Sequence, residues 1–166
     1  IINYSRIKKK QEESTSLVSL NKIIDEAVAQ HLYFKDANEI SIKKDLAINE
    51  LYSDELRLKI IINNLLSNAI KYADETKDKR HIIIKTHTIG DLCKIEVEDN
   101  GLGIKKEHHS RIFEMFFVTQ NKNKGSGLGL YIVNEAIKNL NGNITVDSEI
   151  NIGSKFTVTI PKNYGN

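Results

Sequence analysis

The fold is decided by residues 92–104, LCKIEVEDNGLGI, in which the pattern of a β-strand leads directly into a loop with two glycines. Apolar and charged side chains alternate along the strand, so one of its faces is directed toward a core. Continuing the alternation places Asp99 on that inward face. A buried carboxylate is costly unless it is hydrogen-bonded. Asp99 therefore needs a donor, which either the chain or a ligand must supply.

The same alternation predicts further strands on both sides of this stretch. They are expected at residues 81–88, 144–150 and 155–160, with two short strands around 40–42 and 46–51. Turns at Ile89-Gly90-Asp91 and Asn151-Ile152-Gly153 join neighbouring strands into hairpins. The strands are therefore expected to form one mixed sheet.

Apolar residues at three- and four-residue spacings predict three amphipathic helices. They are expected at residues 20–31, 54–73 and 130–140. Ser53 is expected to cap the second helix, with Asp54 and Glu55 in its first turn, where they complement the helix dipole. Asn141-Gly142 is expected to end the third helix. Strands and helices together indicate an α/β fold with three helices on one sheet.

The second helix carries two stripes of side chains. At about 100° per residue, Asn64, Asn68, Lys71 and Tyr72 gather along the flank of the apolar stripe. Any one of them alone is more often part of a solvated flank. Four such residues along the edge of a buried face instead predict the rim of a ligand pocket.

A second glycine segment, residues 125–130 (GSGLGL), opens the third helix. An isolated Gly-x-Gly is usually only a turn. Glycine backbone amides followed by a helix N-terminus, however, form an anion site, because unpaired N–H groups and the positive dipole end face the same place. The polar stretch 119–126 leading into it is expected to be mobile. The pattern places the upstream aromatic residues Phe113, Phe116 and Phe117 in the core rather than at a ligand.

Composition excludes several other classes. The 166 residues, 40% hydrophobic and 28% charged, fit one globular domain, and a net charge of +2 gives no argument for nucleic acid. A single cysteine, Cys93, excludes an internal disulfide, and the five histidines have no metal-ligand spacing. No apolar run approaches the roughly 20 residues needed to cross a bilayer. A cytoplasmic domain is expected, excised from a longer protein because the chain starts at Ile1.

Four ordered segments resemble the ATPase superfamily of DNA gyrase B, the Hsp90 chaperones, MutL and the sensor histidine kinases (GHKL). The resemblance runs from about Leu17 to Pro161 and implies a Bergerat-type two-layer sandwich with a mobile ATP lid at 119–126. The segments are similar to the N box (64–72), the first glycine box (99–104), the aromatic box (111–117) and the second glycine box (125–130). The aromatic box and the continuation GLGLYIV are similar to histidine kinases in particular.

The resemblance divides the chain and implies its partners. Residues 1–14, which include Tyr4-Ser5-Arg6-Ile7, are similar to the end of the second helix of a dimerisation and histidine phosphotransfer domain, and residues 15–166 to the ATP-binding catalytic domain. The implied partners are the parent's own dimerisation domain and the receiver domain of a response regulator. The parent is expected to be a homodimer and the fragment a monomer. Whether the parent is anchored in the inner membrane stays open.

Roles for individual residues also follow from the resemblance. Asp99 would accept a hydrogen bond from the exocyclic amine of adenine, and Asn68 would place its amide oxygen on Mg²⁺. Asn64 and Lys71 would act on the phosphates as catalytic residues, with Tyr72 beside the base or ribose. The remaining ATP contacts are expected from Gly101, Gly103, Ile104, Phe116, Lys122, Lys124, Gly125, Ser126, Gly127, Leu128, Gly129, Leu130 and Ser154.

Asn64 separates the branches of the superfamily. The hydrolytic members use a glutamate of the N box to activate water, and an amide at this position cannot act as a base. Poor hydrolysis and transfer to a histidine from elsewhere are therefore expected. A clamp or chaperone ATPase and a nucleotide-binding regulatory domain without catalysis stay open as alternatives.

Overall fold

The structure is a computed structural model and describes residues 15–32, 39–119 and 125–164. The expectations for residues 1–14, for Lys122 and Lys124, and for most of the lid lie outside the described residues. In chain order the elements are β1 (Thr15–Ser19), α2 (Leu20–Leu32), β2 (Ile40–Leu46), β3 (Glu50–Asp54), α3 (Glu55–Lys71), β4 (Arg80–Ile89), β5 (Leu92–Asp99), the short 3₁₀ helix η2 (Lys106–His108), α4 (Gly129–Asn139), β6 (Asn143–Glu149) and β7 (Gly153–Pro161).

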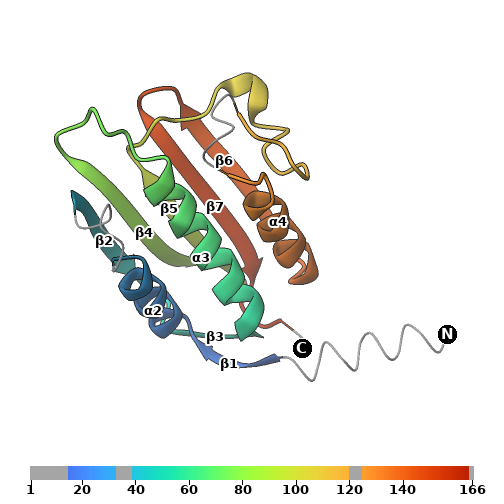
Figure 1. Cartoon of the computed structure of the whole chain (residues 1–166). Coiled ribbons are helices and arrows are strands. Elements are labelled where there is room, and N and C mark those ends of the chain that lie inside the picture. The colour runs from blue at the N-terminus through green and yellow to red at the C-terminus, as the bar shows by residue number, and fades with distance from the viewer. Residues whose placement is uncertain (1–14, 33–38, 120–124, 165–166) are drawn as a thin grey trace.

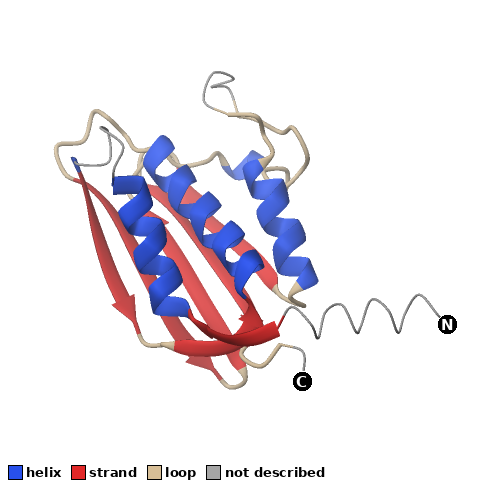
Figure 2. Ribbon diagram, turned by 60° about the horizontal axis from the view of Figure 1, so that its bottom comes forward, coloured by secondary structure: helices blue, strands red, loops and turns tan. Residues whose placement is uncertain are grey.

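Five strands form one mixed sheet in the order β2-β4-β5-β7-β6. β2 pairs with β4 in parallel, and the other neighbouring strands pair antiparallel. The helices α2, α3 and α4 lie side by side on one face of this sheet (Figures 1 and 2). The predicted arrangement of three helices on a mixed, mostly antiparallel sheet is confirmed.

The core lies between the helices and the inward face of the sheet. In β5 the alternation works as predicted, because Cys93, Ile95 and Val97 are buried. The buried side of α3 consists of Leu58, Ile61, Ile62, Leu65, Leu66 and Ala69. Each fully buried aliphatic side chain contributes roughly 1.5–3 kcal/mol. This stripe fixes the rotation of α3 and therefore the direction of its polar flank.

Two local predictions about the N-terminal half are wrong. The strand expected around 46–51 is β3, at residues 50–54, and it does not join the main sheet: it pairs antiparallel with β1 in a separate two-stranded sheet, and β1 was not expected because its sequence is a short, mostly polar run. The N-cap of α3 is Asp54, not Ser53: the Asp54 carboxylate accepts a hydrogen bond of 3.0 Å from the Arg57 amide and pairs with the Arg57 guanidinium. Ser53 is still in β3 and fully buried. The carboxylate replaces the hydroxyl as the cap because it makes both of these contacts with Arg57.

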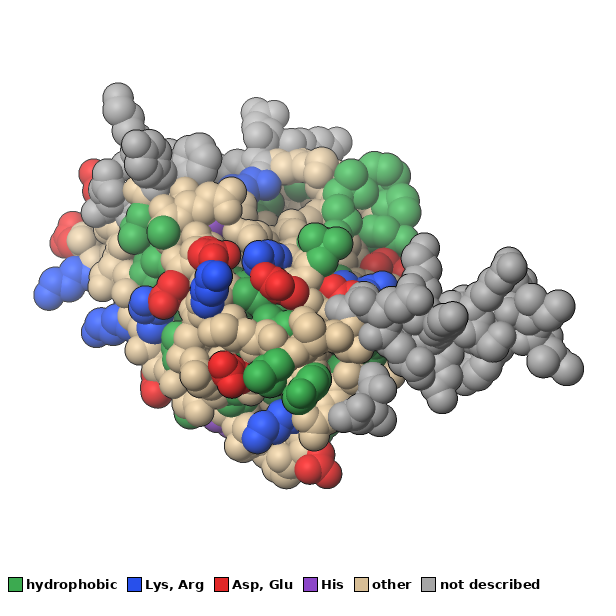
Figure 3. Space-filling view, turned by 90° about the horizontal axis from the view of Figure 1, so that it is seen from below, with side chains coloured by type: hydrophobic (Ala, Val, Ile, Leu, Met, Phe, Trp, Pro, Cys, Tyr) green, Lys and Arg blue, Asp and Glu red, His purple; other side chains and the backbone are tan. Residues whose placement is uncertain are grey.

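The surface carries charges of both signs. Seen from below, Lys and Arg side chains lie among Asp and Glu side chains rather than in a field of one sign (Figure 3). Lys59, for example, pairs with Glu55 at 2.8 Å and with Glu26 at 3.7 Å, which links α3 to α2. None of the helices in the described part of the chain has the length and apolar character needed to cross a membrane.

Candidate functional site

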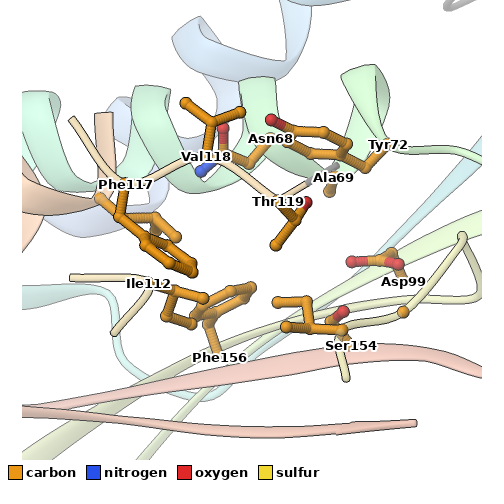
Figure 4. A pocket seen from close by; sticks show the side chains of 13 residues that line it. Asn68, Ala69, Tyr72, Asp99, Ile112, Phe117, Val118, Thr119, Ser154 and Phe156 are labelled. Atoms are coloured by element: carbon orange, nitrogen blue, oxygen red, sulfur yellow. The ribbon is translucent and has the colours of Figure 1, made fainter. Parts of the chain in front are cut away.

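A cavity opens between α3, the loop after β5 and the start of β7 (Figure 4). In Figure 4 Asn68 and Tyr72 project from α3 on one side, while Asp99 and Ser154 lie across from Tyr72. Apolar side chains occupy the other end. The lining consists of Asn68, Ala69, Tyr72, Asp99, Gly103, Ile104, Ile112, Phe117, Val118, Thr119, Leu130, Ser154 and Phe156.

Asp99 is the acidic group at the polar end. Burial raises the pKa of its carboxyl from 3.8 to about 6. The backbone amides of Gly101 and Ser154 and the positive charge of Lys77 oppose this rise, and the negative charge of Glu98 adds to it. The Gly101 amide donates to Oδ1 at 2.8 Å. Asp99 therefore lies on the inward face of β5, as predicted. The Gly101 amide holds one oxygen of its carboxylate, and the residue lines the cavity.

The polar flank of α3 continues into an adjoining cavity. Asn64, Ser67, Asn68, Lys71 and Tyr72 line it from α3, and residues 126–130 line it from the second glycine segment. The predicted gathering of four of these residues is confirmed. Ser67 was not among the predicted residues, although its place between Asn64 and Lys71 on the same flank was a usable signal.

Two amide oxygens of α3 face the start of α4. A β-carbon built on Gly129 would lie 3.2 Å from Oδ1 of Asn64 and 4.0 Å from Oδ1 of Asn68. Asn64 is held in this direction because its Nδ2 donates to the Ile60 carbonyl at 2.8 Å. Amide oxygens and the unpaired N–H groups of a helix N-terminus therefore border the same space. Such a space suits an anion together with a cation that neutralises it.

Lys71 and Tyr72 follow at the end of α3. The Lys71 ammonium lies 5.1 Å from the centroid of the Tyr72 ring. Burial raises the pKa of the Tyr72 phenol, so the hydroxyl stays neutral at physiological pH. The first cavity therefore has an aromatic wall at Tyr72, and the second has a positive charge at Lys71.

The first glycine loop packs tightly on the β6–β7 hairpin. Gly103 has φ of +70°, and a β-carbon there would lie 1.9 Å from the Glu149 carbonyl oxygen. The amide of Ile104 donates to Ser148 Oγ at 2.8 Å, and Ser148 Oγ lies 2.8 Å from Ser154 Oγ. Ser148 was not predicted from the sequence. Strand alternation could have found it, because Ser148 follows Ile144 and Val146 at every second position of β6, on the less exposed face of the strand.

The aromatic box is rearranged relative to expectation. Phe116 was expected to contact ATP and also to be a core residue, but it is 67% exposed and lines neither cavity. Its backbone has φ of +62° and its amide donates to the Gly127 carbonyl at 3.0 Å, which turns the side chain outward. Phe117 lines both cavities instead, with the Arg111 guanidinium 4.5 Å from its ring centroid. Sequence spacing held no signal for this exchange.

The structure brings most of the expected site residues together. Gly101 belongs to the loop that holds Asp99, and Gly125 lies against Lys71. Apart from Phe116, and from Lys122 and Lys124 outside the described residues, the other expected residues line the two cavities. Further lining residues that were not predicted from the sequence are Ala69, Ile112, Val118, Thr119 and Phe156. Phe156 could have been found, because alternation in β7 places it on the same face as Ser154.

The second cavity offers an amide oxygen of the kind that Mg²⁺ accepts as a ligand. No group of three or more His, Cys, Asp or Glu side chains that could hold a metal ion occurs in the described ranges. The side chain of Asn68 has no hydrogen bond to another described residue, so its amide oxygen is available. Mg²⁺ accepts one or two protein oxygens when phosphate oxygens and waters complete its shell. Asn68 fits that requirement.

Comparison with known families gives a match over most of the chain. Residues 53–164 match the family described as histidine kinase-, DNA gyrase B- and HSP90-like ATPase. The matched range contains both cavities.

Individual relatives are sensor kinases. The chain is 37% identical over 150 residues to the sensor-like histidine kinase SenX3 of Mycolicibacterium smegmatis, a match that covers 87% of this chain and 38% of SenX3. It is 42% identical over 115 residues to the sensor histidine kinase RcsC of Escherichia coli, covering 67% of this chain and 12% of RcsC. The chain thus spans well under half the length of these curated relatives.

Solved structures share the fold. The catalytic domain of histidine kinase ThkA, free of nucleotide, matches with a TM-score of 0.77 and 26% identity over 90% of this chain and 96% of that domain. A solved chain of the mycobacterial sensor histidine kinase MprB matches with a TM-score of 0.78 at 21% identity over 90% of this chain and 98% of that chain. Full-length ShkA in complex with AMPPNP matches with a TM-score of 0.77 at 24% identity over 89% of this chain and 31% of ShkA.

Proposed function

Because the chain belongs to the histidine kinase-, DNA gyrase B- and HSP90-like ATPase family, we propose that it binds ATP with Mg²⁺ and transfers the γ-phosphoryl group to a histidine. The acceptor is in the dimerisation domain of the same parent protein, a dimer in its full-length form. From there the phosphoryl group passes to the receiver domain of a response regulator. The chain itself is the ATP-binding catalytic domain of a sensor histidine kinase, and the acceptor and receiver are the proposed part.

The position of Asp99 supports the proposal that the nucleotide bound in the first cavity carries adenine. It is the acidic side chain among the described residues that line the first cavity, opposite the Tyr72 ring. The exocyclic amine of adenine donates a hydrogen bond, whereas guanine presents a carbonyl oxygen at the same place. A carboxylate there accepts the amine and repels the carbonyl. ATP is therefore favoured over GTP.

The second cavity suits the phosphates. The N-terminus of α4 and the ammonium of Lys71 supply positive potential, while Asn64 and Asn68 supply amide groups. Magnesium, when bound through Asn68, would neutralise phosphate charge. With the phosphates in this cavity, Lys71 and Asn64 would orient the γ-phosphate.

The residues of the site favour transfer over hydrolysis. In the proposed step a neutral imidazole nitrogen of the acceptor attacks the γ-phosphorus, the bond to the β–γ bridging oxygen breaks, and ADP leaves. Asn64 cannot take a proton from water, so water is not activated at this position. The chain instead contributes positioning and electrostatic stabilisation, which suffice when the nucleophile is docked in line.

Phosphotransfer in trans tests the proposal. The domain is incubated with γ-labelled ATP and Mg²⁺, alone and with the separately produced dimerisation domain of its parent, and acid-labile label is followed on each protein. We expect label on the dimerisation domain only, at a rate that rises with its concentration. Asn64→Ala and Lys71→Ala should slow transfer by about tenfold or more while weakening ATP binding less.

Asn63→Ala is the matched control for Asn64→Ala. The Asn63 side chain donates to the Lys59 carbonyl at 2.9 Å and lines neither cavity, so its loss should leave transfer nearly unchanged. Rapid phosphate release by the domain alone would favour a clamp-type ATPase. ATP binding without label at any partner concentration would favour a regulatory nucleotide-binding domain.

A further inference from the structure

Lys77 lies on the loop between α3 and β4 and lines neither of the two cavities. Its ammonium nevertheless donates to three backbone carbonyls: Asn100 at 2.6 Å, Asn151 at 2.7 Å and Ile152 at 3.2 Å. A lysine ammonium has three N–H donors. All three are used here, on two segments that are far apart in the sequence.

The loop presents Lys77 from a fixed turn. The carboxylate of Asp74 is buried and accepts hydrogen bonds from the Thr76 amide at 3.0 Å and the Thr76 hydroxyl at 2.6 Å. These bonds hold the pKa of Asp74 below its usual value, so the turn stays closed at neutral pH. The Lys77 amide in turn donates to the Asp74 carbonyl at 3.1 Å. The lysine stem therefore starts from an ordered base, which lowers the entropy lost when the ammonium is held.

The three acceptor carbonyls lie on both sides of Asp99. Asn100 follows Asp99 directly in the chain. Asn151 and Ile152 immediately precede Gly153, and a β-carbon on Gly153 would lie 2.0 Å from the Asp99 carbonyl oxygen. The β6–β7 turn and the first glycine loop thus touch at Asp99, and Lys77 holds both.

We propose that Lys77 is a positioning residue for the base end of the cavity: by holding the carbonyls of Asn100, Asn151 and Ile152 it fixes the backbone around Asp99 and so the direction of the Asp99 carboxylate. The inference rests on the proposed function, because the carboxylate is taken to receive the amine of adenine. Lys77 touches neither the base nor the phosphates in this arrangement. It acts through Asp99.

Lys77 also supports the charge of Asp99. Its positive charge lowers the pKa of the Asp99 carboxyl, against the negative charge of Glu98. Tyr72 is the other titratable side chain among the described residues that line the first cavity. The groove that borders Asp99 on its other side adds the titratable side chains of His81, Asp147, Glu149 and Lys155. Loss of Lys77 removes the nearby cation, so Asp99 should hold its proton to a higher pH.

The test compares Lys77→Met and Lys77→Arg with Lys79→Met. Lys79 is an exposed lysine of the same loop whose side chain has no hydrogen bond within the described ranges. Lys79→Met therefore removes one positive charge, as Lys77→Met does, but no contact with a backbone carbonyl. Two measurements are made on the whole domain: ATP affinity by calorimetry at pH 7.5, roughly physiological, and the titration of the Asp99 carboxyl by carbon NMR without nucleotide. Amide exchange at residues 100–103 and 150–153 is followed as well, and melting confirms that each variant folds.

Lys77→Met should weaken ATP binding by about tenfold, raise the titration midpoint of Asp99 by about half a pH unit or more, and speed exchange in both segments. Lys77→Arg keeps the charge, so it should return the midpoint close to that of the parent. Lys79→Met should change affinity less than about twofold.

The inference is overturned if the titration midpoint of Asp99 rises no more in Lys77→Met than in Lys79→Met. It is also overturned if a folded Lys77→Met domain binds ATP with unchanged affinity. Should Lys77→Met not fold, Lys77→Arg decides: an unchanged rate of exchange in both segments overturns the inference, because a guanidinium directs its donors in one plane, whereas the ammonium directs three donors from a single nitrogen toward the three carbonyls. The titration and exchange require no nucleotide. If the parent bound no ATP at all, the proposed function would fail while these two measurements still judged the role of Lys77 at Asp99.

Discussion

The ammonium of Lys71 occupies the space that a side chain at position 125 would need: a β-carbon built on Gly125 would lie 2.2 Å from Lys71 Nζ. The C-terminal turn of α3 and the end of the segment before α4 therefore meet at this glycine. The contact joins the residue expected to act on the phosphates to the backbone expected to cover them.

Gly125→Ala should displace the Lys71 ammonium without unfolding the domain. Because the blocking atom is the far end of a flexible side chain, we expect a loss of less than about 1 kcal/mol in the free energy of unfolding, but at least severalfold slower phosphotransfer. Gly103→Ala is the contrast: its β-carbon would meet the Glu149 carbonyl at 1.9 Å and φ is +70°, so more than about 2 kcal/mol should be lost. Denaturant unfolding and the transfer assay measure both. Equal stability losses in the two variants would contradict this explanation.

Asp99→Asn should stabilise the nucleotide-free domain while weakening ATP binding. The pKa of Asp99 rises from 3.8 to about 6 on folding. The folded domain therefore holds this proton more tightly than the unfolded chain, and its free energy of unfolding falls as the pH rises between these two values. At pH 7 the uncharged variant should therefore be more stable by about 1–3 kcal/mol, and below about pH 4 the advantage should vanish. ATP affinity should fall by about tenfold or more, since a charged hydrogen bond is lost.

Unfolding curves at several pH values, together with calorimetry, test both halves. The parent should also lose ATP affinity as pH falls through about 6, and Asp99→Asn should not follow the same profile. A variant that binds ATP as tightly as the parent would remove Asp99 from the proposed role.

Asn68→Ala should weaken the part of ATP binding that depends on magnesium. The Asn68 amide oxygen is available in the second cavity, and a lost protein ligand to Mg²⁺ should reduce affinity by about tenfold with the metal present. With a chelator the parent and the variant should bind alike. Calorimetry in both conditions is the measurement, with Asn63→Ala as the control; an equal loss with and without metal would indicate a folding defect instead.

Asp54→Ala should destabilise the domain by about 1–2 kcal/mol, since it removes the N-cap of α3 and leaves the Arg57 amide without its acceptor. Ser53→Ala should be neutral or slightly stabilising, because the buried Ser53 hydroxyl has no hydrogen-bond partner within the described residues. Thermal melts of the two variants compare neighbouring positions directly. The reverse order of stability would restore Ser53 as the cap.

Sequence by itself determined the elements that depend on periodicity. The alternation in residues 92–99 located β5 and the inward Asp99, and the apolar stripe of α3 determined that Asn64, Asn68, Lys71 and Tyr72 would share a flank. These features follow from the fixed geometry of a strand and a helix, in which side-chain direction depends only on position along the chain. The Asn141-Gly142 stop of α4 was likewise local, since Asn141 adopts a φ of +54° and the Gly142 amide bonds back to the Ile137 carbonyl.

Only the tertiary structure decided which side chains meet across segments. It placed Phe117 rather than Phe116 at the cavities, because a positive φ at Phe116, with its amide bonded to Gly127, turns one ring outward. It gave the cap of α3 to Asp54 and brought the Lys77 ammonium to three carbonyls of two distant segments. Such contacts depend on the three-dimensional approach of segments far apart in the chain, which no local repeat of the sequence encodes.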